Sequence, residues 1–299
     1  MSSAETSLGR FASAKVNLYL HVGPPKANGR HDLDSLVVFG GIGATDHLRA
    51  EPADELSLQV TGPQAAAAGD GEGNLVLKAA RALQAASGTR KGARLRLDKH
   101  LPVAAGIGGG SSDAAAALRL LTEIWEIDPA HAAAIAPGLG GDVPVALAGV
   151  PALMRGEGER VTPLTSLPRL SAALINPRVP CHTGPVFRAH DAAGGGAGFR
   201  EIDPLPAFPD EKSLASWLAT QRNDLEAPAI AMVPEIGAVL DFLRAQRSVL
   251  LARMSGSGAT CFALFEDLAS AERATVVLKN DSEKKHWWSA ATRLGPVLE

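Results

Sequence analysis

Alternating apolar and polar positions near the start of the chain predict a first β-strand over residues 11–22. One face of this strand carries Ala14, Val16, Leu18 and Leu20, and the other carries Lys15, Asn17, Tyr19 and His21. This period of two is typical of a strand that is buried on one side only. Residues 33–40, 56–60 and 93–97 also read as strands.

Apolar positions three and four apart predict helices over residues 74–86, 112–125 and 128–136, with Asn74 as the N-cap of the first. Short strands are expected between residues 145 and 161. In the second half we predict a loose stretch at 177–209, helices at 213–219, 233–245 and 268–278, and strands at 172–176, 249–253, 260–265 and 287–293. Because strands and helices do not alternate regularly, the pattern indicates an α+β fold.

The composition shifts over residues 151–168, which predicts a boundary between two domains, 1–150 and 151–299. A chain of 299 residues fits two domains at the usual ~150 residues each.

Composition and charge exclude several classes of protein. The chain is 46% hydrophobic and 20% charged with a net charge of −3, and it has no dense basic run for binding nucleic acid or an anionic membrane. Cys181 and Cys261, its two cysteines, form neither a disulfide scaffold nor a zinc motif. The polar N-terminus and the short apolar run at residues 143–154 fit neither a signal peptide nor a membrane span, so we expect a cytoplasmic protein.

A glycine- and serine-rich segment precedes the helix predicted at 112–125; it comprises Gly106, Ile107, Gly108, Gly109, Gly110, Ser111 and Ser112. Glycines let a ligand approach the backbone, and a helix N-terminus offers free N–H donors and partial positive charge. The segment therefore predicts a phosphate site, the alternative being a flexible loop with a serine N-cap. No Gly-Lys-Ser/Thr ends the run, which excludes a Walker P-loop, and the acidic residue of a Rossmann fingerprint is not in place.

Three segments, taken in order, resemble one family. They are residues 14–18 (Ala-Lys-Val-Asn-Leu), residues 102–115 (Pro-x-x-x-Gly-Ile-Gly-Gly-Gly-Ser-Ser-Asp-Ala-Ala) and the glycine-rich residues 254–262. Together they resemble the motifs of the GHMP kinases, the family of galactokinase, homoserine kinase, mevalonate kinase and phosphomevalonate kinase. The resemblance implies a two-domain α+β fold with the active-site cleft between the domains, and direct in-line transfer of the γ-phosphoryl group of ATP to a hydroxyl.

In this family a lysine and an aspartate carry phosphoryl transfer, and the matching positions are Lys15 and Asp142. The chemistry needs a carboxylate to accept the hydroxyl proton and a cation to offset developing charge. Taken alone, Lys15 also reads as a solvated strand residue, and Asp142, two residues before Pro144, also reads as a helix N-cap.

The resemblance also implies an ATP site, formed by Pro102, Ala104, Ala105, Gly106, Ile107, Gly108, Gly109, Gly110, Ser111, Ser112, Asn74 and Lys99. Asn74 and Lys99 would reach the base, although Lys99 also reads as a solvated charge. Mg²⁺ is expected with ATP and without a dedicated protein cage, because phosphate oxygens and water would supply most of its ligands. Asp113 or Ser112 could contribute one ligand.

Three features are most similar to one branch of the family: the triple glycine followed by Ser111 and Ser112, the Gly29-x-His31 hairpin, and residues 141–144 (Gly-Asp-Val-Pro). That branch phosphorylates the 2-hydroxyl of a cytidine-diphosphate sugar alcohol in non-mevalonate isoprenoid synthesis. That likeness assigns substrate binding to Asn17, His31, Arg30, Phe187, Ser255, Gly256 and Gly258, with Phe187 stacking on the cytosine. Arg30 and Val37 stand where this branch often has aromatic residues. A guanidinium can stack on a base, so Arg30 is a possible substitute.

Two alternatives stay open at this point. One is a GHMP kinase for another acceptor, of the homoserine or phosphomevalonate type. The other is a non-catalytic nucleotide-binding homologue, which the presence of both Lys15 and Asp142 speaks against. The expected partners are ATP and a small-molecule substrate, with no nucleic acid and no membrane, in a monomer or a homodimer.

Overall fold

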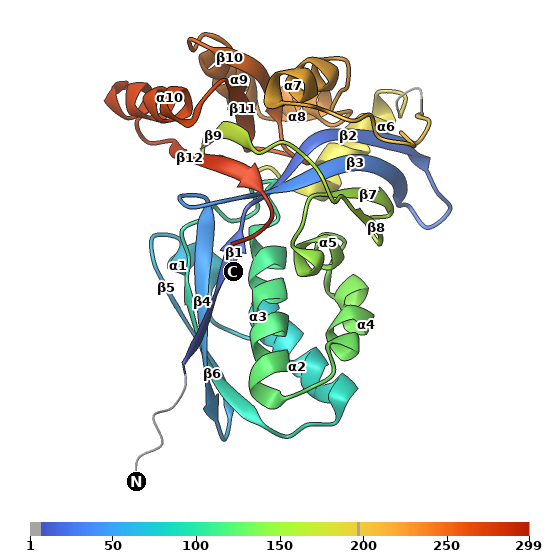
Figure 1. The fold of residues 1–299 in the computed structure, drawn as a ribbon, viewed down its shortest axis with the longest axis vertical. Coiled ribbons are helices and arrows are strands. Elements are labelled where there is room, and N and C mark those ends of the chain that lie inside the picture. Colours follow the sequence, from blue (N-terminus) through green and yellow to red (C-terminus); the bar gives the residue numbers. More distant parts are fainter. Residues whose placement is uncertain (1–6, 196–197, 299) are drawn as a thin grey trace.

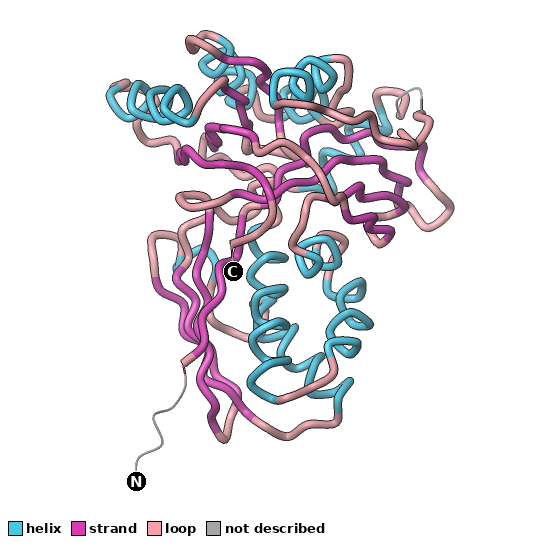
Figure 2. The backbone as a smooth tube through the Cα atoms, viewed as in Figure 1, coloured by secondary structure: helices cyan, strands magenta, loops and turns pink. Residues whose placement is uncertain are grey.

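The computed structural model describes residues 7–195 and 198–298, which form two sheets with helices packed against both (Figure 1). The four-stranded sheet has the order β1-β4-β6-β5, made of β1 (Leu8–Ser13), β4 (Thr45–Ala53), β6 (Gly92–Asp98) and β5 (Leu56–Thr61). The helices of this half are α1 (Ala65–Ala68), α2 (Leu75–Ser87), α3 (Gly109–Trp125), α4 (Pro129–Leu139) and α5 (Val143–Ala148). Figure 2 shows the backbone of this sheet beside that of α3. The core of this half lies between them, where the small side chains of the alanine-rich α3 let the helix approach closely.

The eight-stranded sheet lies in the upper half of Figure 1. Its order is β10-β11-β9-β12-β3-β7-β8, with β2 paired to β3; the strands are β10 (Val249–Met254), β11 (Cys261–Phe265), β9 (Leu170–Asn176), β12 (Trp288–Gly295), β3 (His31–Gly40), β7 (Ala152–Gly156), β8 (Arg160–Pro163) and β2 (Lys15–Pro25). The helices of this half are α6 (Thr183–Ala192), α7 (Glu211–Ala219), α8 (Glu226–Met232), α9 (Glu235–Arg244) and α10 (Leu268–Asn280).

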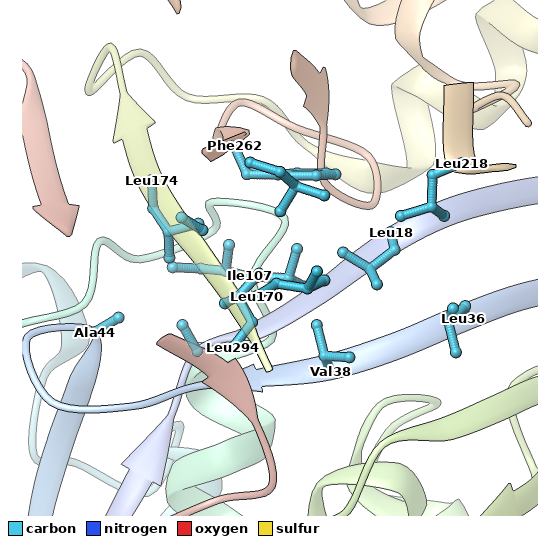
Figure 3. Close-up of a cluster of buried hydrophobic side chains, with 14 of the residues drawn as sticks. Leu18, Leu36, Val38, Ala44, Ile107, Leu170, Leu174, Leu218, Phe262 and Leu294 are labelled. Atoms are coloured by element: carbon cyan, nitrogen blue, oxygen red, sulfur yellow. The ribbon is translucent and has the colours of Figure 1, made fainter. Parts of the chain in front are cut away.

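The large sheet is buried on both faces. Along β9, Ala172 and Leu174 face one hydrophobic cluster, while Ala173 and Ile175 face another that α8, α9 and α10 cover. Ile107, from the predicted phosphate loop, is fully buried in the first cluster with strand residues such as Leu174 (Figure 3). Burying this side chain fixes the loop against the sheet.

The prediction of a half-buried first strand was wrong, because β2 is buried on both faces from Lys15 to Gly23. The pairing with β3 shifts by one residue between Asn17 and Tyr19, which is a β-bulge. Beyond the bulge the alternation reverses: Leu18 packs into the cluster around Ile107, whereas Leu20 packs into the cluster on the other face. Leu20 therefore shares a face with Lys15 and Asn17, contrary to the periodicity.

Three other expectations need correction. Residues 143–148 form α5 rather than a strand, since Pro144 occupies the first turn of a helix, where its missing N–H costs nothing. The stretch at 177–209 contains α6, and α8 was not foreseen. The helix expected from residue 112 begins at Gly109, so its first turn includes the glycines. The predicted helix at 74–86 is confirmed, with Asn74 as its cap.

The large sheet takes β2 and β3 from the first 150 residues and β7 to β12 from the remainder. The division at residues 150 and 151 stays a prediction. Within the described ranges, no helix has the length and apolarity needed to cross a membrane.

Candidate active site

Lys15 and Asp142 form an ion pair, with 3.0 Å between Nζ and Oδ2. Lys15 begins β2 and its side chain is only 5% exposed, so it is not the solvated strand residue that its position alone allowed. Its Nζ also donates to Asn17 Oδ1 over 2.7 Å. Asp142 occupies the N-cap position of α5, yet its side chain makes no capping hydrogen bond. The carboxylate instead faces the lysine, with 31% of its side chain open to solvent.

The phosphate-type loop lies directly beside this pair. Gly108 adopts a left-handed conformation, and a Cβ at this position would lie 3.3 Å from Asp142 Oδ2. Residue 108 therefore needs glycine for both its conformation and this close approach. Gly109, Gly110 and Ser111 form the first turn of α3, whose leading N–H groups have no partners within the helix. Donors of this kind and a helix dipole are suited to phosphate oxygens, as the sequence predicted for this loop.

The glycine-rich loop at residues 255–259 packs against the phosphate loop. Ser255 Oγ donates to Gly106 O and accepts from Asn17 N, both over 3.1 Å. A Cβ on Gly106, which has a φ of 74°, would lie 2.5 Å from Gly258 O. Thr260 N donates to Ala105 O over 3.0 Å. Direct hydrogen bonds thus join the three segments that resemble GHMP kinase motifs, residues 14–18, 102–115 and 254–262.

One cavity of about 540 Å³ collects most of the predicted residues. Its lining includes Lys15, Asn17, Ala104, Ala105, Gly106, Gly108, Gly109, Gly110, Ser111, Asp142, Phe187 and Gly256. Five predicted residues are buried and lie outside this lining: Pro102, Ile107, Ser112, Ser255 and Gly258. Asn74 caps α2 through Val76 N and donates to Gly69 O, and the adjacent Leu75 reaches the cavity.

Lys99 lies beneath the phosphate loop rather than in the cavity. Its ammonium is 2.5 Å from Asp46 Oδ2 and 2.6 Å from Asp113 Oδ2, and all three side chains are buried. Asp46 also accepts hydrogen bonds from the backbone N–H groups of His100 and Leu101. The cluster thus ties β4 and the end of β6 to the N-terminal part of α3.

The charged groups of this cluster shift one another's pKa values. Burial disfavours the Lys99 ammonium, but the two carboxylates outweigh it and raise its pKa. Burial raises the pKa of Asp113 to about 7, with Asp46 adding to the shift and Lys99 opposing it. The Asp113 side chain is only 4% exposed and lies outside the cavity lining, so its carboxylate is not placed to bind a Mg²⁺ ion there.

A second cavity, of about 530 Å³, shares four lining residues with the first, Leu33, Gly141, Glu157 and Phe187, so the two form one continuous cleft. His31 and Phe187 stand side by side in it, with ring centroids 4.9 Å apart and planes inclined by 38°. His31 Nε2 lies 2.8 Å from Asp191 Oδ1. This pair forms an aromatic surface at the far end of the cleft.

Arg30 also lines this end of the cleft, but it pairs with Glu157 over 3.2 Å and its side chain is 70% exposed. Hydrogen bonds from Asn28 and Lys26, with a smaller one from Arg30, lower the pKa of Glu157 to about 2, so it is an anion at neutral pH. Val37 is fully buried in the cluster with Phe39 and Met154 and does not reach the cleft.

Known proteins resemble this chain over nearly its whole length. The family model for the GHMP kinases N terminal domain matches residues 74–150, and that for the GHMP kinases C terminal region matches residues 205–283. The chain is 74% identical over 295 residues to the "4-diphosphocytidyl-2-C-methyl-D-erythritol kinase" of Hyphomonas neptunium, covering 99% of both chains. It is 50% identical to the enzyme of the same name from Paramagnetospirillum magneticum, covering 97% and 99%. The chain belongs to the GHMP kinases.

Solved GHMP kinases share the whole fold. A crystal structure of 4-(cytidine 5'-diphospho)-2C-methyl-D-erythritol kinase is 35% identical, with a TM-score of 0.72 and coverage of 96% of this chain and 99% of that one. A homoserine kinase from Cytophaga hutchinsonii has a TM-score of 0.63 at 17% identity, covering 99% and 96%, which shows the fold alone. The predicted fold class is confirmed, and the protein is an ATP-dependent small-molecule kinase.

A larger cavity of about 780 Å³ lies elsewhere, between α3, α4, α5 and residues 296–298. It contains neither the Lys15–Asp142 pair nor the glycine loops of this GHMP kinase, so size alone does not identify the active site. Across residues 7–195 and 198–298, no group of three or more His, Cys, Asp or Glu side chains is placed to hold a metal ion.

Several residues of the cleft were not foreseen from the sequence. Glu157, Cys181 and Thr183 line it, and Asp191 positions His31. Asp191 lies one helical turn after Phe187, so a helix prediction for α6 would have placed the two on one face. No local signal marks the other three, because each reaches the cleft only through the packing of β7 and α6 around it.

Proposed function

We propose that this chain transfers the γ-phosphoryl group of ATP to the 2-hydroxyl of 4-diphosphocytidyl-2-C-methyl-D-erythritol. The observation that carries the proposal is the position of the Lys15–Asp142 pair, between the phosphate-type loop and the His31–Phe187 pair of one cleft. The names of the relatives with 74% and 50% identity support the same acceptor.

Each of the three parts of the cleft binds a different part of the substrates. The first turn of α3 and the loop before it bind the phosphates of ATP. His31 and Phe187 hold the cytosine by stacking and hydrogen bonding at the other end, although Arg30 is held by Glu157 rather than by Phe187. The acceptor hydroxyl then lies between them, next to Asp142, which favours the in-line geometry that phosphoryl transfer needs.

Asp142 acts as the base. Its carboxylate accepts the hydroxyl proton while the hydroxyl oxygen attacks the γ-phosphorus; the bond from that phosphorus to the bridging oxygen breaks, and ADP leaves. Lys15, held by Asn17, orients Asp142 and offsets the negative charge that develops. Asn17 is fixed in turn by a hydrogen bond to Ser35 Oγ, so the pair is pre-organised.

The donor set in the cleft fits a Mg²⁺ ion that arrives with ATP rather than a resident ion. Asp142 and Glu157 are carboxylates in this cleft, but Asp142 is paired with Lys15, and Glu157 is held by Lys26, Asn28 and Arg30. When bound, Mg²⁺ would neutralise phosphate charge, with phosphate oxygens and water as most of its ligands. The cytoplasmic location and the choice between monomer and homodimer stay predictions.

The experiment is a coupled ADP-release assay on the purified protein with three acceptors: the cytidyl substrate, homoserine and phosphomevalonate. Turnover is expected with the cytidyl substrate. Asp142→Asn should lower kcat at least ~100-fold, the usual range for a positioned acid–base group, without unfolding the protein. The matched control is Asp54→Asn, an exposed aspartate outside the cleft.

Two results would overturn the proposal. A good rate with homoserine or phosphomevalonate and none with the cytidyl substrate would assign another acceptor. Near-normal turnover by Asp142→Asn would remove Asp142 from the mechanism, whatever the acceptor.

A further inference from the structure

A five-residue segment, Arg222–Glu226, leads from the loop after α7 into the first residue of α8 and is bound along β2. We call this segment the 222–226 brace. Leu20 N donates to Arg222 O over 3.0 Å, and Asp224 N donates to Leu20 O over 2.9 Å. The side chain of Asp224 accepts a third hydrogen bond, from Val22 N over 2.8 Å. The brace therefore pairs with the side of β2, the strand that carries Lys15 and Asn17, just beyond its bulge.

Asn223 joins this brace to the glycine-rich loop. Its Nδ2 donates to Met254 O over 2.9 Å and to Gly256 O over 2.8 Å. Its Oδ1 accepts from Leu225 N over 3.0 Å, which fixes which end of the amide faces the loop. The side chain is buried, and Glu226 adds a hydrogen bond from Met254 N. All polar atoms of the Asn223 amide face backbone groups, and none is directed at a substrate.

The orientation of one peptide group follows from these contacts. In a trans peptide the C=O and the next N–H point in opposite directions. Because Gly256 O points at Asn223, the Ser257 N–H points away from the brace. Both Gly256 and Ser257 line the cleft. Gly256 lies close to Asn17, the hydrogen-bond partner of Lys15: a Cβ on Gly256 would be 3.3 Å from Asn17 Oδ1.

Two N–H groups of this loop lack acceptors among the residues that the structure describes. Ser255 N donates to Thr260 O and Gly258 N to Ser255 O, but neither Gly256 N nor Ser257 N has a hydrogen-bond partner within residues 7–195 and 198–298. Successive backbone N–H groups in such a turn form a concave site for an anionic oxygen. The ligands of a kinase cleft supply such oxygens as phosphate groups.

We propose that Asn223 is a positioning residue, which holds the Gly256–Ser257 turn so that its two free N–H groups bind a phosphate oxygen of the substrates. The inference rests on the proposed function, because that function places two candidate phosphates here: the diphosphate of the acceptor and the γ-phosphoryl group of ATP. The shared chemistry is a phosphate oxygen next to Asn17 and Asp142.

The test compares Asn223→Asp and Asn223→Ala with the wild-type protein. The aspartate keeps the shape and the acceptor for Leu225 N, but it places an anionic oxygen against the two carbonyls. The alanine removes the side chain and shows whether the effect depends on the new charge. Leu278→Ala in α10 is the matched control, because it destabilises the same half of the molecule from a fully buried position outside the cleft.

Measured quantities are kcat, the KM for acceptor and ATP, the inhibition constant of cytidine diphosphate, and the thermal midpoint. Both Asn223 variants should lose at least ~10-fold in kcat/KM for the acceptor, the range for one hydrogen bond to a charged group. A rise in acceptor KM together with weaker inhibition by cytidine diphosphate assigns the acceptor's diphosphate. A fall in kcat with both KM values unchanged assigns the γ-phosphoryl group.

Either result supports the proposal, whereas two others would overturn it. One is unchanged kinetics in both Asn223 variants. The other is a loss of activity that Leu278→Ala reproduces at an equal fall in thermal midpoint. The proposed function is tested separately on the wild-type protein, because the Asn223 ratios can be measured with whichever acceptor that protein turns over.

Discussion

Replacing Lys99 by methionine tests whether the buried cluster beneath the phosphate loop is held together by its central cation. Methionine keeps the length and most of the volume of the side chain but removes the charge and its hydrogen bonds. The Asp46 and Asp113 carboxylates, which are 0% and 4% exposed, would then lie next to each other with no counter-ion. Two like charges in a buried site are strongly unfavourable.

The expected magnitude follows from this burial. Removing one partner of a buried ion pair costs about 3–5 kcal/mol, because the remaining charge is left uncompensated. Unfolding entropies of about 2.1 cal/mol/K per residue give roughly 0.6 kcal/mol/K for a chain of 299 residues. Lys99→Met should therefore lower the thermal midpoint by about 5–8 °C at pH 8.

The loss should depend on pH with a definite sign. With Lys99 in place, burial already raises the pKa of Asp113 from 3.8 to about 7, and removal of the cation raises it further. In the folded variant Asp113 keeps its proton to a higher pH than in the unfolded chain, which releases it above about pH 4. The free energy of unfolding therefore falls as the pH rises from about 4 through 7 and beyond. Lys99→Met should be least destabilised at pH 5.

Thermal unfolding followed by circular dichroism gives the midpoint, and urea unfolding gives the free energy of unfolding; both are measured at pH 5 and at pH 8. The double variant Lys99→Met/Asp113→Asn is the control, since it leaves a single carboxylate and should recover part of the loss at pH 8. A loss below ~1 kcal/mol at pH 8, or a loss independent of pH, would refute the account of the cluster given above.

Two further predictions concern the cleft. Phe187→Ala should raise the acceptor KM about 5- to 150-fold in steady-state assays and leave the ATP KM unchanged, because stacking on a base is worth ~1–3 kcal/mol; an unchanged acceptor KM would mean that the base is held in another way. Gly106→Ala should lower both the thermal midpoint and kcat, since its Cβ would lie 2.5 Å from Gly258 O at a φ of 74°. Gly138→Ala, where a Cβ meets nothing within 4 Å, is its control, and equal effects of the two would contradict this reasoning.

Local patterns in the sequence predicted the conformation of several candidate site segments correctly where one element decides the outcome. The alternation in β2 placed Lys15 and Asn17 on one face, and the hydrogen bond between them agrees. The cap at Asn74 and the glycine run before α3 were visible for the same reason, since turn and cap preferences act over a few residues.

The same patterns were insufficient where the outcome depends on residues far apart in the chain. The bulge after Asn17 turns Leu20 towards the cleft, and period-two reasoning assumes that no such register shift occurs. Lys99 read as a solvated charge or a ligand of ATP, but Asp46 and Asp113, 53 and 14 residues away, draw it into the interior.

The sequence by itself determined which segments are the candidates for the chemistry of this kinase: the Lys15 strand, the glycine-rich loop before α3 and Asp142. Side-chain type and short-range spacing suffice for that, because they decide which groups can carry charge, turn the chain or open a helix N-terminus. Only the tertiary structure decided which of these groups meet. Asn17 N reaches Ser255 Oγ across 238 residues of chain, and Asn223 reaches Gly256 from a segment that no local pattern marks. Such contacts form when the two sheets and their helices pack, since a buried backbone donor or acceptor is more stable when it has a hydrogen-bond partner.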